Sequence, residues 1–372
     1  MLQRFRRRRE ETKKDPRKLA ARGMGTAEAI AAATPGYVGA GSRALQWREL
    51  SAAATGIPAD LLDYLESGEV TDLLVNDGTV WVARGTGLER ADVALGPPDQ
   101  VRQVAVRMAA AAGRRLDDAS PMVDAVLGGR YRLHAVLPPI SKTGAAISLR
   151  VVASKPFSLE SLVESGSLHP RVARVLRQDV QEGRAVLISG GTGAGKTTLL
   201  ASLLGLVQAN QRIVCIEEAS ELVIDHPHVV HLQSRDTNVE GSGGLGLAEL
   251  VRAAMRMRPD RLVLGECRGA EVREVLTAMN TGHRGGAATI HANSIRDVPA
   301  RLVALASLGG LSPQTTTLLA ASAFDRLVHV SQDRQGLRYV SALGTLETRH
   351  GALVGTEQLR VERSGRTALD LL

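Results

Sequence analysis

Apolar and polar positions alternate along the first regular part of the chain, and this period of two predicts β-strands. Residues 69–83, EVTDLLVNDGTVWVA, are predicted to form two strands joined at Asn76-Asp77-Gly78, because Asp-Gly is a strong signal for a hairpin turn. Further elements are predicted as a helix at 98–113 and strands at 130–140 and 144–152. Together these elements predict a compact α+β domain over residues 50–152.

From about residue 171 the pattern changes to short apolar runs separated by helical stretches. The runs that predict strands are 185–189, 213–217, 229–233, 262–266 and 287–290. The helical patterns are 196–208, 246–257, 269–280 and 295–307. Strands separated by helices pair in parallel, so this part of the chain predicts an α/β domain with a doubly wound, mainly parallel sheet.

Segments of different composition flank the two predicted domains. Residues 23–49 are rich in Ala and Gly, which predicts a linker or a loosely held helix. Residues 153–170 carry a Pro and a candidate helix cap at Ser158, which favours an interdomain linker. The predicted order is a basic arm 1–22, a linker 23–49, an α+β N-terminal domain 50–152, an interdomain linker 153–170, a P-loop domain 171–345 and a C-terminal tail 346–372.

The stretch VLISGGTGAGKTTLL contains the phosphate-binding pattern G-x-x-x-x-G-K-[ST]. A buried strand enters this loop and a helix leaves it, which is the context that the pattern requires. The predicted nucleotide contacts are Gly190, Gly191, Thr192, Gly193, Ala194, Gly195, Lys196, Thr197 and Thr198. Backbone N–H groups and the helix N-terminus would hold the phosphates of ATP, Lys196 would neutralise them, and Thr197 would hold Mg²⁺.

Acidic residues follow two of the predicted strands. RLVLGE ends in Gly265-Glu266, where a carboxylate can reach a nucleotide at the carboxyl edge of the sheet, so Glu266 is a candidate metal ligand. The alternative is a surface glutamate paired with Arg268. In IVCIEEASEL, Glu217 and Glu218 point to opposite faces, so only one of them can face the phosphates.

The segment TGHRGGAATIHANS places His283 in a Gly-rich turn and His291 at a strand end. Two histidines without a third ligand are weak support for a transition-metal site. A role as polar groups that respond to the γ-phosphate is favoured, and a structural histidine is the alternative for each.

The net charge of +7 first suggests a nucleic-acid partner. Residues 1–22, however, hold ten Arg or Lys and three Asp or Glu, and the rest of the chain is balanced. Only 2% of the residues are aromatic, which leaves little material for stacking bases. Nucleic-acid binding is therefore disfavoured, and the arm is interpreted as a solvated tail, with contact to anionic lipid as the alternative.

Four motifs in order resemble those of the type II/type IV secretion ATPases, the ring ATPases of secretion, pilus assembly and conjugation. GGTGAGKTT, IEEASEL, MRMRPDRLVLGECRGAE and TGHRGGAATIHANS look like the Walker A, Asp-box, Walker B and His-box motifs of this family. RLHAVLPP and ISLR resemble its N-terminal domain, and the version here is most like the Tad/Flp-pilus branch.

This resemblance implies a hexamer with nucleotide between an N-terminal domain and a RecA-like domain. It implies that Glu217 activates water and that Glu266 is the Walker B carboxylate, and it places His283 and His291 near the nucleotide. It also implies that Arg132 and Arg150 reach the phosphates, with Arg130 a weaker match. Glu218 departs from the family, which more often has Asp there, so the division of labour between Glu217 and Glu218 stays open.

The leading interpretation is a Mg²⁺-dependent ATPase motor that acts on inner-membrane platform proteins of a pilus or secretion system. A RecA-like DNA motor or helicase is the alternative. A transporter ATPase would need an LSGGQ signature, which the sequence lacks. Cys215 and Cys267 form no metal or disulfide framework, and no apolar run reaches the roughly 20 residues of a membrane span. A cytoplasmic protein at the inner face of the membrane is therefore expected.

Overall fold

A computed structural model describes residues 40–84, 87–152, 156–235, 243–282, 285–333, 335–361 and 367–368. Contacts between residues divide the chain into two units, Met1–Ala153 and Ser154–Leu372, called unit 1 and unit 2 below. The predicted basic arm and most of the predicted linker 23–49 lie outside the described residues.

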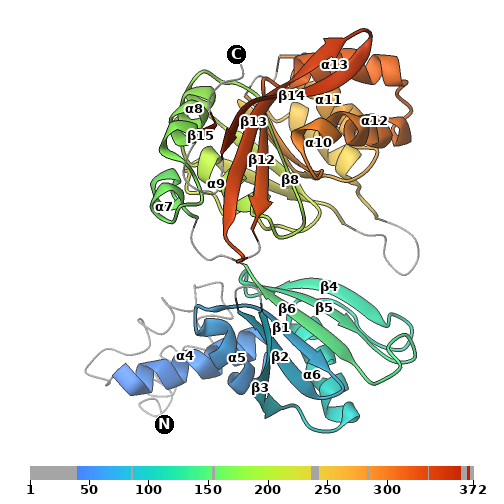
Figure 1. The fold of residues 1–372 in the computed structure, drawn as a ribbon. Helices are drawn as coiled ribbons and strands as arrows, with labels where there is room; N and C mark the ends of the chain where they lie inside the picture. Colours follow the sequence, from blue (N-terminus) through green and yellow to red (C-terminus); the bar gives the residue numbers. More distant parts are fainter. Residues whose placement is uncertain are drawn as a thin grey trace, which may run out of the picture. The chain divides into compact units, whose positions relative to one another are not determined.

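Unit 1 is an antiparallel sheet with helices packed on one face (Figure 1). Its helices are α4 (Ala40–Thr55), α5 (Ala59–Glu66) and α6 (Pro98–Ala111). Its strands are β1 (Val70–Asn76), β2 (Thr79–Arg84), β3 (Gly87–Ala94), β4 (Met122–Leu127), β5 (Tyr131–Val136) and β6 (Ala146–Val151). The spatial order is β3-β2-β1-β6-β5-β4.

The predicted hairpin of unit 1 is confirmed. Asn76 pairs with Thr79 across a two-residue turn, and Asp77 and Gly78 both have positive φ, at 50° and 74°. This is the geometry that matches the twist of a two-residue hairpin and that favours Asp-Gly.

Only one face of the unit 1 sheet contributes to its hydrophobic core. Along β5, Tyr131, Leu133 and Ala135 are buried with residues of α5 and α6, and the positions between them face the other way. On that other face Arg132 of β5 lies directly opposite Arg150 of β6. The open face therefore carries polar and charged side chains in the middle of its strands.

Unit 2 is a larger sheet covered by helices on both sides (Figure 1). Its strands are β7 (Val186–Gly190), β8 (Ile213–Glu217), β9 (Val229–Gln233), β10 (Arg261–Cys267), β11 (Ala287–His291), β12 (Arg326–Gln332), β13 (Arg338–Arg349), β14 (Ala352–Val361) and β15 (Thr367–Ala368). Its helices are α7 (Leu159–Glu164), α8 (Pro170–Gln181), α9 (Lys196–Leu204), α10 (Leu247–Met255), α11 (Val272–Asn280), α12 (Val298–Leu308) and α13 (Pro313–Ala323), with a short 3₁₀ turn η1 (Ile295–Asp297) before α12. The order β15-β14-β13-β12-β7-β11-β10-β8-β9 is parallel from β12 to β9.

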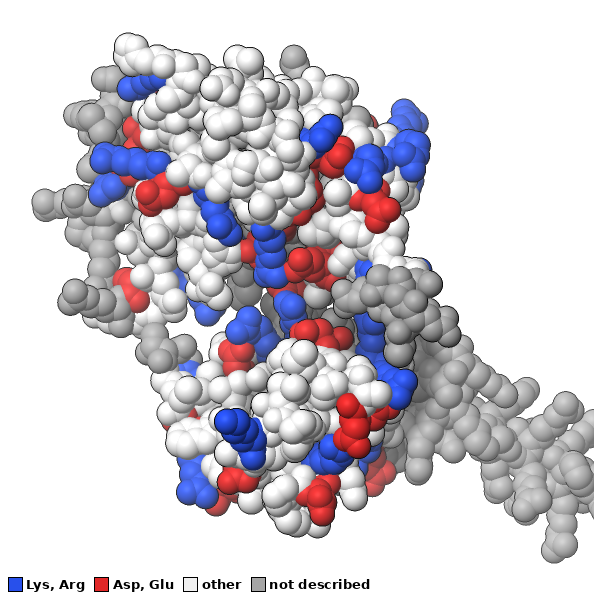
Figure 2. All heavy atoms as spheres, turned by 90° about the vertical axis from the view of Figure 1, so that its right-hand side faces the viewer, with Lys and Arg blue, Asp and Glu red and all other residues white. Residues whose placement is uncertain are grey.

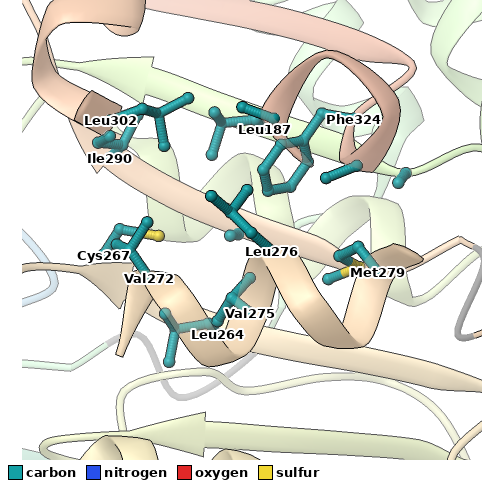
Figure 3. Close-up of a cluster of buried hydrophobic side chains, with 14 of the residues drawn as sticks. Leu187, Leu264, Cys267, Val272, Val275, Leu276, Met279, Ile290, Leu302 and Phe324 are labelled. Carbon is teal, nitrogen blue, oxygen red and sulfur yellow. The ribbon is translucent and has the colours of Figure 1, made fainter. Parts of the chain in front are cut away.

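Two hydrophobic clusters lie on opposite faces of this sheet, as the alternation along a strand requires. On β7, Leu187 belongs to the cluster with α10 to α13, whereas Ile188 belongs to the cluster with α7 to α9. Figure 3 shows the first cluster, where Leu276 and Val275 of α11 lie against strand residues such as Leu264. The continuous apolar runs in the sequence thus belong to strands buried on both faces, and the predicted α/β fold is confirmed.

The structure forms helices within both predicted linkers. Helix α4 begins at Ala40, inside the segment 23–49 that was predicted as a linker or a loosely held helix, and α7 lies inside the predicted linker 153–170. The expected cap at Ser158 is present, because its hydroxyl accepts a hydrogen bond from the Ser161 N–H at 3.1 Å. The sheet also continues through β13 and β14, beyond residue 345 where a tail was predicted.

Candidate nucleotide-binding site

The Gly-rich loop joins the central strand β7 to helix α9. Gly190 lies so close to β12 that a Cβ atom there would be 2.4 Å from the Val330 carbonyl oxygen. Gly195 has φ +97° and directly precedes α9, a conformation that glycine adopts without the usual steric cost. The N-terminus of α9 therefore directly follows the loop. The N–H groups of a helix N-terminus are a favourable place for phosphate groups.

Lys196 is the first residue of α9 and its side chain is buried, with 7% of the residue exposed. Its ammonium group donates hydrogen bonds to the carbonyl oxygens of Gly190 and Gly191, at 3.2 and 2.9 Å. The same Nζ lies 3.2 Å from Nε2 of His291, which ends β11. The lysine thus lies within the loop and also reaches the end of a neighbouring strand.

Glu266 and His291 meet beside this lysine. His291 Nε2 lies 2.7 Å from Glu266 Oε1, but this oxygen is buried and has no aligned hydrogen-bond partner among the described residues. The other carboxylate oxygen pairs with Arg268 at 2.8 Å. Glu266 thus pairs with Arg268, as the alternative interpretation expected, and also contacts His291 beside the loop lysine.

The two neighbouring glutamates after β8 have different surroundings. Glu217 is 5% exposed, and its Oε1 accepts hydrogen bonds from the N–H groups of Glu221 and Leu222, both at 2.9 Å. Its Oε2 lies 3.5 Å from His231 Nδ1 and has no hydrogen-bond partner among the described residues. Glu218 is half-exposed and contacts Arg268 Nη1 at 2.5 Å.

Gly265 brings these acidic residues close together. A Cβ atom at Gly265 would lie 3.0 Å from Cγ of Glu217, so the absent side chain leaves room for Glu217 beside the end of β10. The carbonyl oxygen of Gly265 also accepts a hydrogen bond from the Thr289 hydroxyl at 2.6 Å, which fixes β10 against β11. The strand ends are therefore held at fixed positions around the loop.

Burial changes the ionisation of two groups in this cluster. It lowers the pKa of the Lys196 ammonium, and the nearby Glu266 carboxylate partly offsets this effect. Burial also lowers the pKa of His291, with Lys196 acting in the same direction and Glu266 in the opposite one. The neutral form of His291 is favoured, so its ring can accept as well as donate a hydrogen bond.

The remaining predicted residues fall in three groups. Thr197 and Thr198 begin α9 and are partly exposed, while Thr192 and Gly193 are exposed in the loop and Ala194 is buried. His283 lies outside the described residues. The predicted arginines belong to unit 1 and are described there by themselves.

In unit 1, Arg150 pairs with Asp72 of β1, with Nε 2.7 Å from Oδ1. Arg132 lies opposite Arg150 on the same open face. Arg130 lies in the turn before β5, 3.8 Å from Glu66 and over the ring of Tyr131. Arg132 and Arg150 thus share one face, and Arg130 has partners elsewhere.

Sequence analysis missed a buried polar pair directly below the loop. Ser189 of β7 contacts His329 Nδ1 of β12 at 2.9 Å, and the histidine is 7% exposed. No motif marks His329, because its strand lies outside the four motif segments. The only signal is a histidine within the apolar run RLVHV.

The residues present fit a magnesium nucleotide. Oε1 of Glu266 is buried, lies 2.7 Å from His291 Nε2 and receives no aligned hydrogen bond from the described residues, and the Thr197 hydroxyl lies on the first turn of α9. Among the residues that the structure describes, no group of three His, Cys, Asp or Glu side chains could hold a transition metal. The combination of loop, lysine and strand-end carboxylate defines a P-loop nucleoside triphosphatase.

Comparison with known proteins identifies the family. The model of the type II/IV secretion system protein family matches residues 70–369, and the chain belongs to this family of secretion ATPases. A Mycobacterium tuberculosis protein provisionally assigned to conjugal transfer is 46% identical over 312 residues, which cover 82% of this chain and 88% of that protein. The conjugal transfer protein TrbB of Rhizobium radiobacter is 31% identical over 280 residues, which cover 74% and 83%.

Solved structures confirm the fold. The pilus retraction motor PilT with bound ADP superposes with a TM-score of 0.56 at 20% identity, covering 78% of this chain and 84% of that one. The Legionella pneumophila ATPase DotB gives a TM-score of 0.53 at 18% identity, covering 83% and 82%. At these identities the likeness shows a shared fold and no more.

The described part of the chain has no helix that is both long and apolar enough to cross a bilayer. On the face drawn in Figure 2, basic and acidic side chains are interspersed, and uncharged surface covers a broad area of unit 2. Within the described residues of unit 2 drawn in this view, the basic side chains form no continuous stripe of the kind that tracks a phosphate backbone.

Proposed function

We propose that the protein is the ATP-hydrolysing motor of a conjugal-transfer or other type IV secretion apparatus, in which hydrolysis drives motions against membrane platform proteins. The observation that carries the chemistry is the meeting of Lys196, His291 and Glu266 at the Gly-rich loop, with contacts of 3.2 and 2.7 Å. The names of the relatives support the cellular role. Assignment to the Tad/Flp-pilus branch stays a prediction from the motifs.

Each residue has a proposed task in hydrolysis. The loop N–H groups and Lys196 bind the β- and γ-phosphates, and Thr197 with Glu266 holds Mg²⁺, which would neutralise phosphate charge when bound. Glu217 is proposed to orient water, because its unpartnered Oε2 is a buried acceptor at the end of β8. His291, and by resemblance His283, would respond to the γ-phosphate.

The wider assembly is also part of the proposal. We infer a homo-oligomer, with a hexamer as the expected size, that acts at the cytoplasmic face of the membrane. Arg132 and Arg150 are proposed to neutralise phosphate charge. The predicted interdomain linker, residues 153–170, is proposed as the hinge about which the two domains move. For residues 1–22, contact with anionic lipid stays the alternative to a solvated tail.

The test compares nucleotide binding with hydrolysis in three variants. Lys196→Ala should lose both, because the charge that neutralises the phosphates is gone. Glu266→Gln and Glu217→Gln should bind ATP within a few-fold of wild type by calorimetry but hydrolyse it at least about 100-fold more slowly. Glutamine can still accept the two N–H bonds that Glu217 receives, so that variant keeps the local fold.

Glu274→Gln is the matched control, since it makes the same change on the surface of α11, where Glu274 pairs with Arg252. This variant should hydrolyse ATP at the wild-type rate. Equal loss of binding in all three site variants would contradict the separate tasks given to the loop and the carboxylates.

A further inference from the structure

Arg268 connects two acidic residues that come from different parts of the sequence. Its Nη2 lies 2.8 Å from Oε2 of Glu266 at the end of β10, and its Nη1 lies 2.5 Å from Oε2 of Glu218, which follows β8. One guanidinium group therefore bridges the Walker B-like segment and the Asp-box-like segment. None of the tasks assigned above uses this residue.

The backbone of Arg268 is itself held firmly. The N–H groups of Arg268 and Gly269 both donate to Oε1 of Glu271, at 2.6 and 2.8 Å, and Glu271 is 6% exposed. Cys267 on the other side is buried in the core. The guanidinium thus extends from a fixed point, which distinguishes it from a surface arginine with a mobile backbone.

The bridge matters because its two partners repel each other. Two ionised carboxylates near one site repel each other, and a cation between them offsets this repulsion. A guanidinium has a planar fork that can bind two acceptors in fixed directions, whereas a lysine ammonium is a point charge on a flexible stem. The spacing between Glu218 and Glu266 therefore depends on the shape of Arg268 as well as on its charge.

The segment that Arg268 anchors also carries Glu217. This residue directly precedes Glu218, and its Oε1 holds the turn at Glu221 and Leu222. Tying Glu218 to the end of β10 consequently fixes the position of the whole turn relative to Glu266. A shift of about 1 Å in such groups is enough to cost a large factor in rate.

We propose that Arg268 is a positioning residue that sets the spacing between the Glu217–Glu218 segment and Glu266 for hydrolysis. This inference rests on the proposed ATPase function. It assigns no contact between Arg268 and the nucleotide, so loss of the bridge should lower kcat and leave nucleotide affinity intact.

The first test uses single variants of Arg268. Arg268→Gln should lower kcat about 30-fold or more, and Arg268→Lys about tenfold, because lysine holds only one of the two carboxylates. The dissociation constant for ATP, measured by calorimetry, should stay within about twofold of wild type. Arg252→Gln is the control, since it removes a surface arginine paired with Glu274 on another helix, and its kcat should be unchanged.

A double-mutant cycle with Glu218 tests the bridge itself. If Arg268 acts through Glu218, the variant with both Arg268→Gln and Glu218→Gln should be no more than about threefold slower than the slower single variant. A residue with a merely structural role would give losses that multiply. Thermal melting of each variant shows whether folding is retained, and Arg268→Lys keeps the charge if the glutamine variant unfolds.

Three results would overturn the inference. These are a wild-type kcat for Arg268→Lys, losses that multiply in the double variant, and a raised dissociation constant for ATP with unchanged kcat. A wild-type protein without ATPase activity would instead overturn the proposed function. The two failures are therefore distinguishable in the same set of assays.

Discussion

The two sheets of this protein differ in how many of their faces are covered, and this decides where each can present functional side chains. In unit 2, helices bury both faces, so the strands are apolar along their length and polar groups occur at the strand ends. Glu217, Glu266 and His291 all lie at such ends. In unit 1 one face is open, and Arg132 and Arg150 lie in the strands themselves.

Each arrangement has a different physical consequence. Strand ends in a parallel sheet converge on one edge, so polar side chains gather there while the strand interiors stay mainly apolar. An open antiparallel face instead gives a row of side chains at fixed spacing. On this face Arg132 lies directly opposite Arg150, and Arg150 pairs with Asp72 of the next strand, with Nε 2.7 Å from Oδ1.

The first prediction tests whether unit 2 buries both faces of its sheet and unit 1 only one. In each sheet, two neighbouring side chains on one strand, which point to opposite faces, are replaced by alanine. On β7, Leu187 and Ile188 are both fully buried in different clusters, so Leu187→Ala and Ile188→Ala should each cost about 2–5 kcal/mol. On β5, Leu133→Ala should cost a similar amount. His134→Ala, on the open face, should change the free energy of unfolding by no more than about 0.5 kcal/mol.

Native-state hydrogen exchange of the full chain measures these costs unit by unit, because two units need not unfold together. Substitutions on β7 should accelerate exchange in unit 2, and Leu133→Ala should accelerate it in unit 1. A large effect of His134→Ala would mean that the face described as open is covered by a partner that contributes to stability.

The second prediction concerns the function of the open face. Arg132→Ala should lower the hydrolysis rate about 100-fold, roughly 2.7 kcal/mol in activation free energy, and should leave ATP affinity and oligomer size unchanged. The reason is that, in the proposed function, Arg132 neutralises part of the phosphate charge during hydrolysis. A wild-type rate for this variant would return Arg132 to a structural role.

A mixing experiment shows whether this arginine acts within its own subunit, as we propose. Co-assembled Arg132→Ala and Lys196→Ala subunits should recover no activity, because every intact loop then lacks its arginine. Clear recovery would mean that a neighbouring subunit donates it. Mixed assemblies must be demonstrated with differently tagged subunits before absence of recovery is interpreted.

The two regions also differ in how well their sequences predicted them. The strands β7 to β11 are short, mainly apolar runs, and their positions were predicted almost to the residue. Strand β3, GLERADVA, lies at a sheet edge with only Ala91 buried, so its sequence has little hydrophobic pattern. Strand β14 also has little hydrophobic pattern, because the polar residues of TEQLR interrupt its apolar positions.

The candidate site was predictable where chemistry is carried by a motif. The loop and Glu266 follow from local patterns, because strand, loop and helix are consecutive in the sequence. The pair of Glu266 with Arg268 was named as an alternative, but the link from Arg268 to Glu218 and the pair between Ser189 and His329 could not be predicted, since each depends on strand order. In the sheet, β12 lies beside β7 and β10 lies beside β8. This order is set by tertiary packing and cannot be predicted from any single segment of the sequence.

The last and smallest effect concerns His329, which lies in the covered sheet below the loop. Burial lowers the pKa of His329 from its ordinary value near 6.5, while Glu357 and Asp297 act in the opposite direction and Lys196 in the same one. The folded protein therefore binds this proton less readily than the unfolded chain. The stability from neutral His329 is complete above about pH 6.5 and is lost as the pH falls through the lowered pKa.

Replacing this histidine should make the free energy of unfolding depend less on pH below about pH 6.5. One proton changes the free energy of unfolding by at most about 1.4 kcal/mol per pH unit, and His329→Gln should remove that slope below pH 6.5, as measured by denaturant unfolding at several pH values. Ser189→Ala is the matched control: it removes the hydroxyl partner but keeps the buried imidazole, so it should lower stability at every pH and retain the slope. An unchanged slope in His329→Gln would show that other groups cause the acid sensitivity, and the covered sheet would then contain no titrating group below the loop.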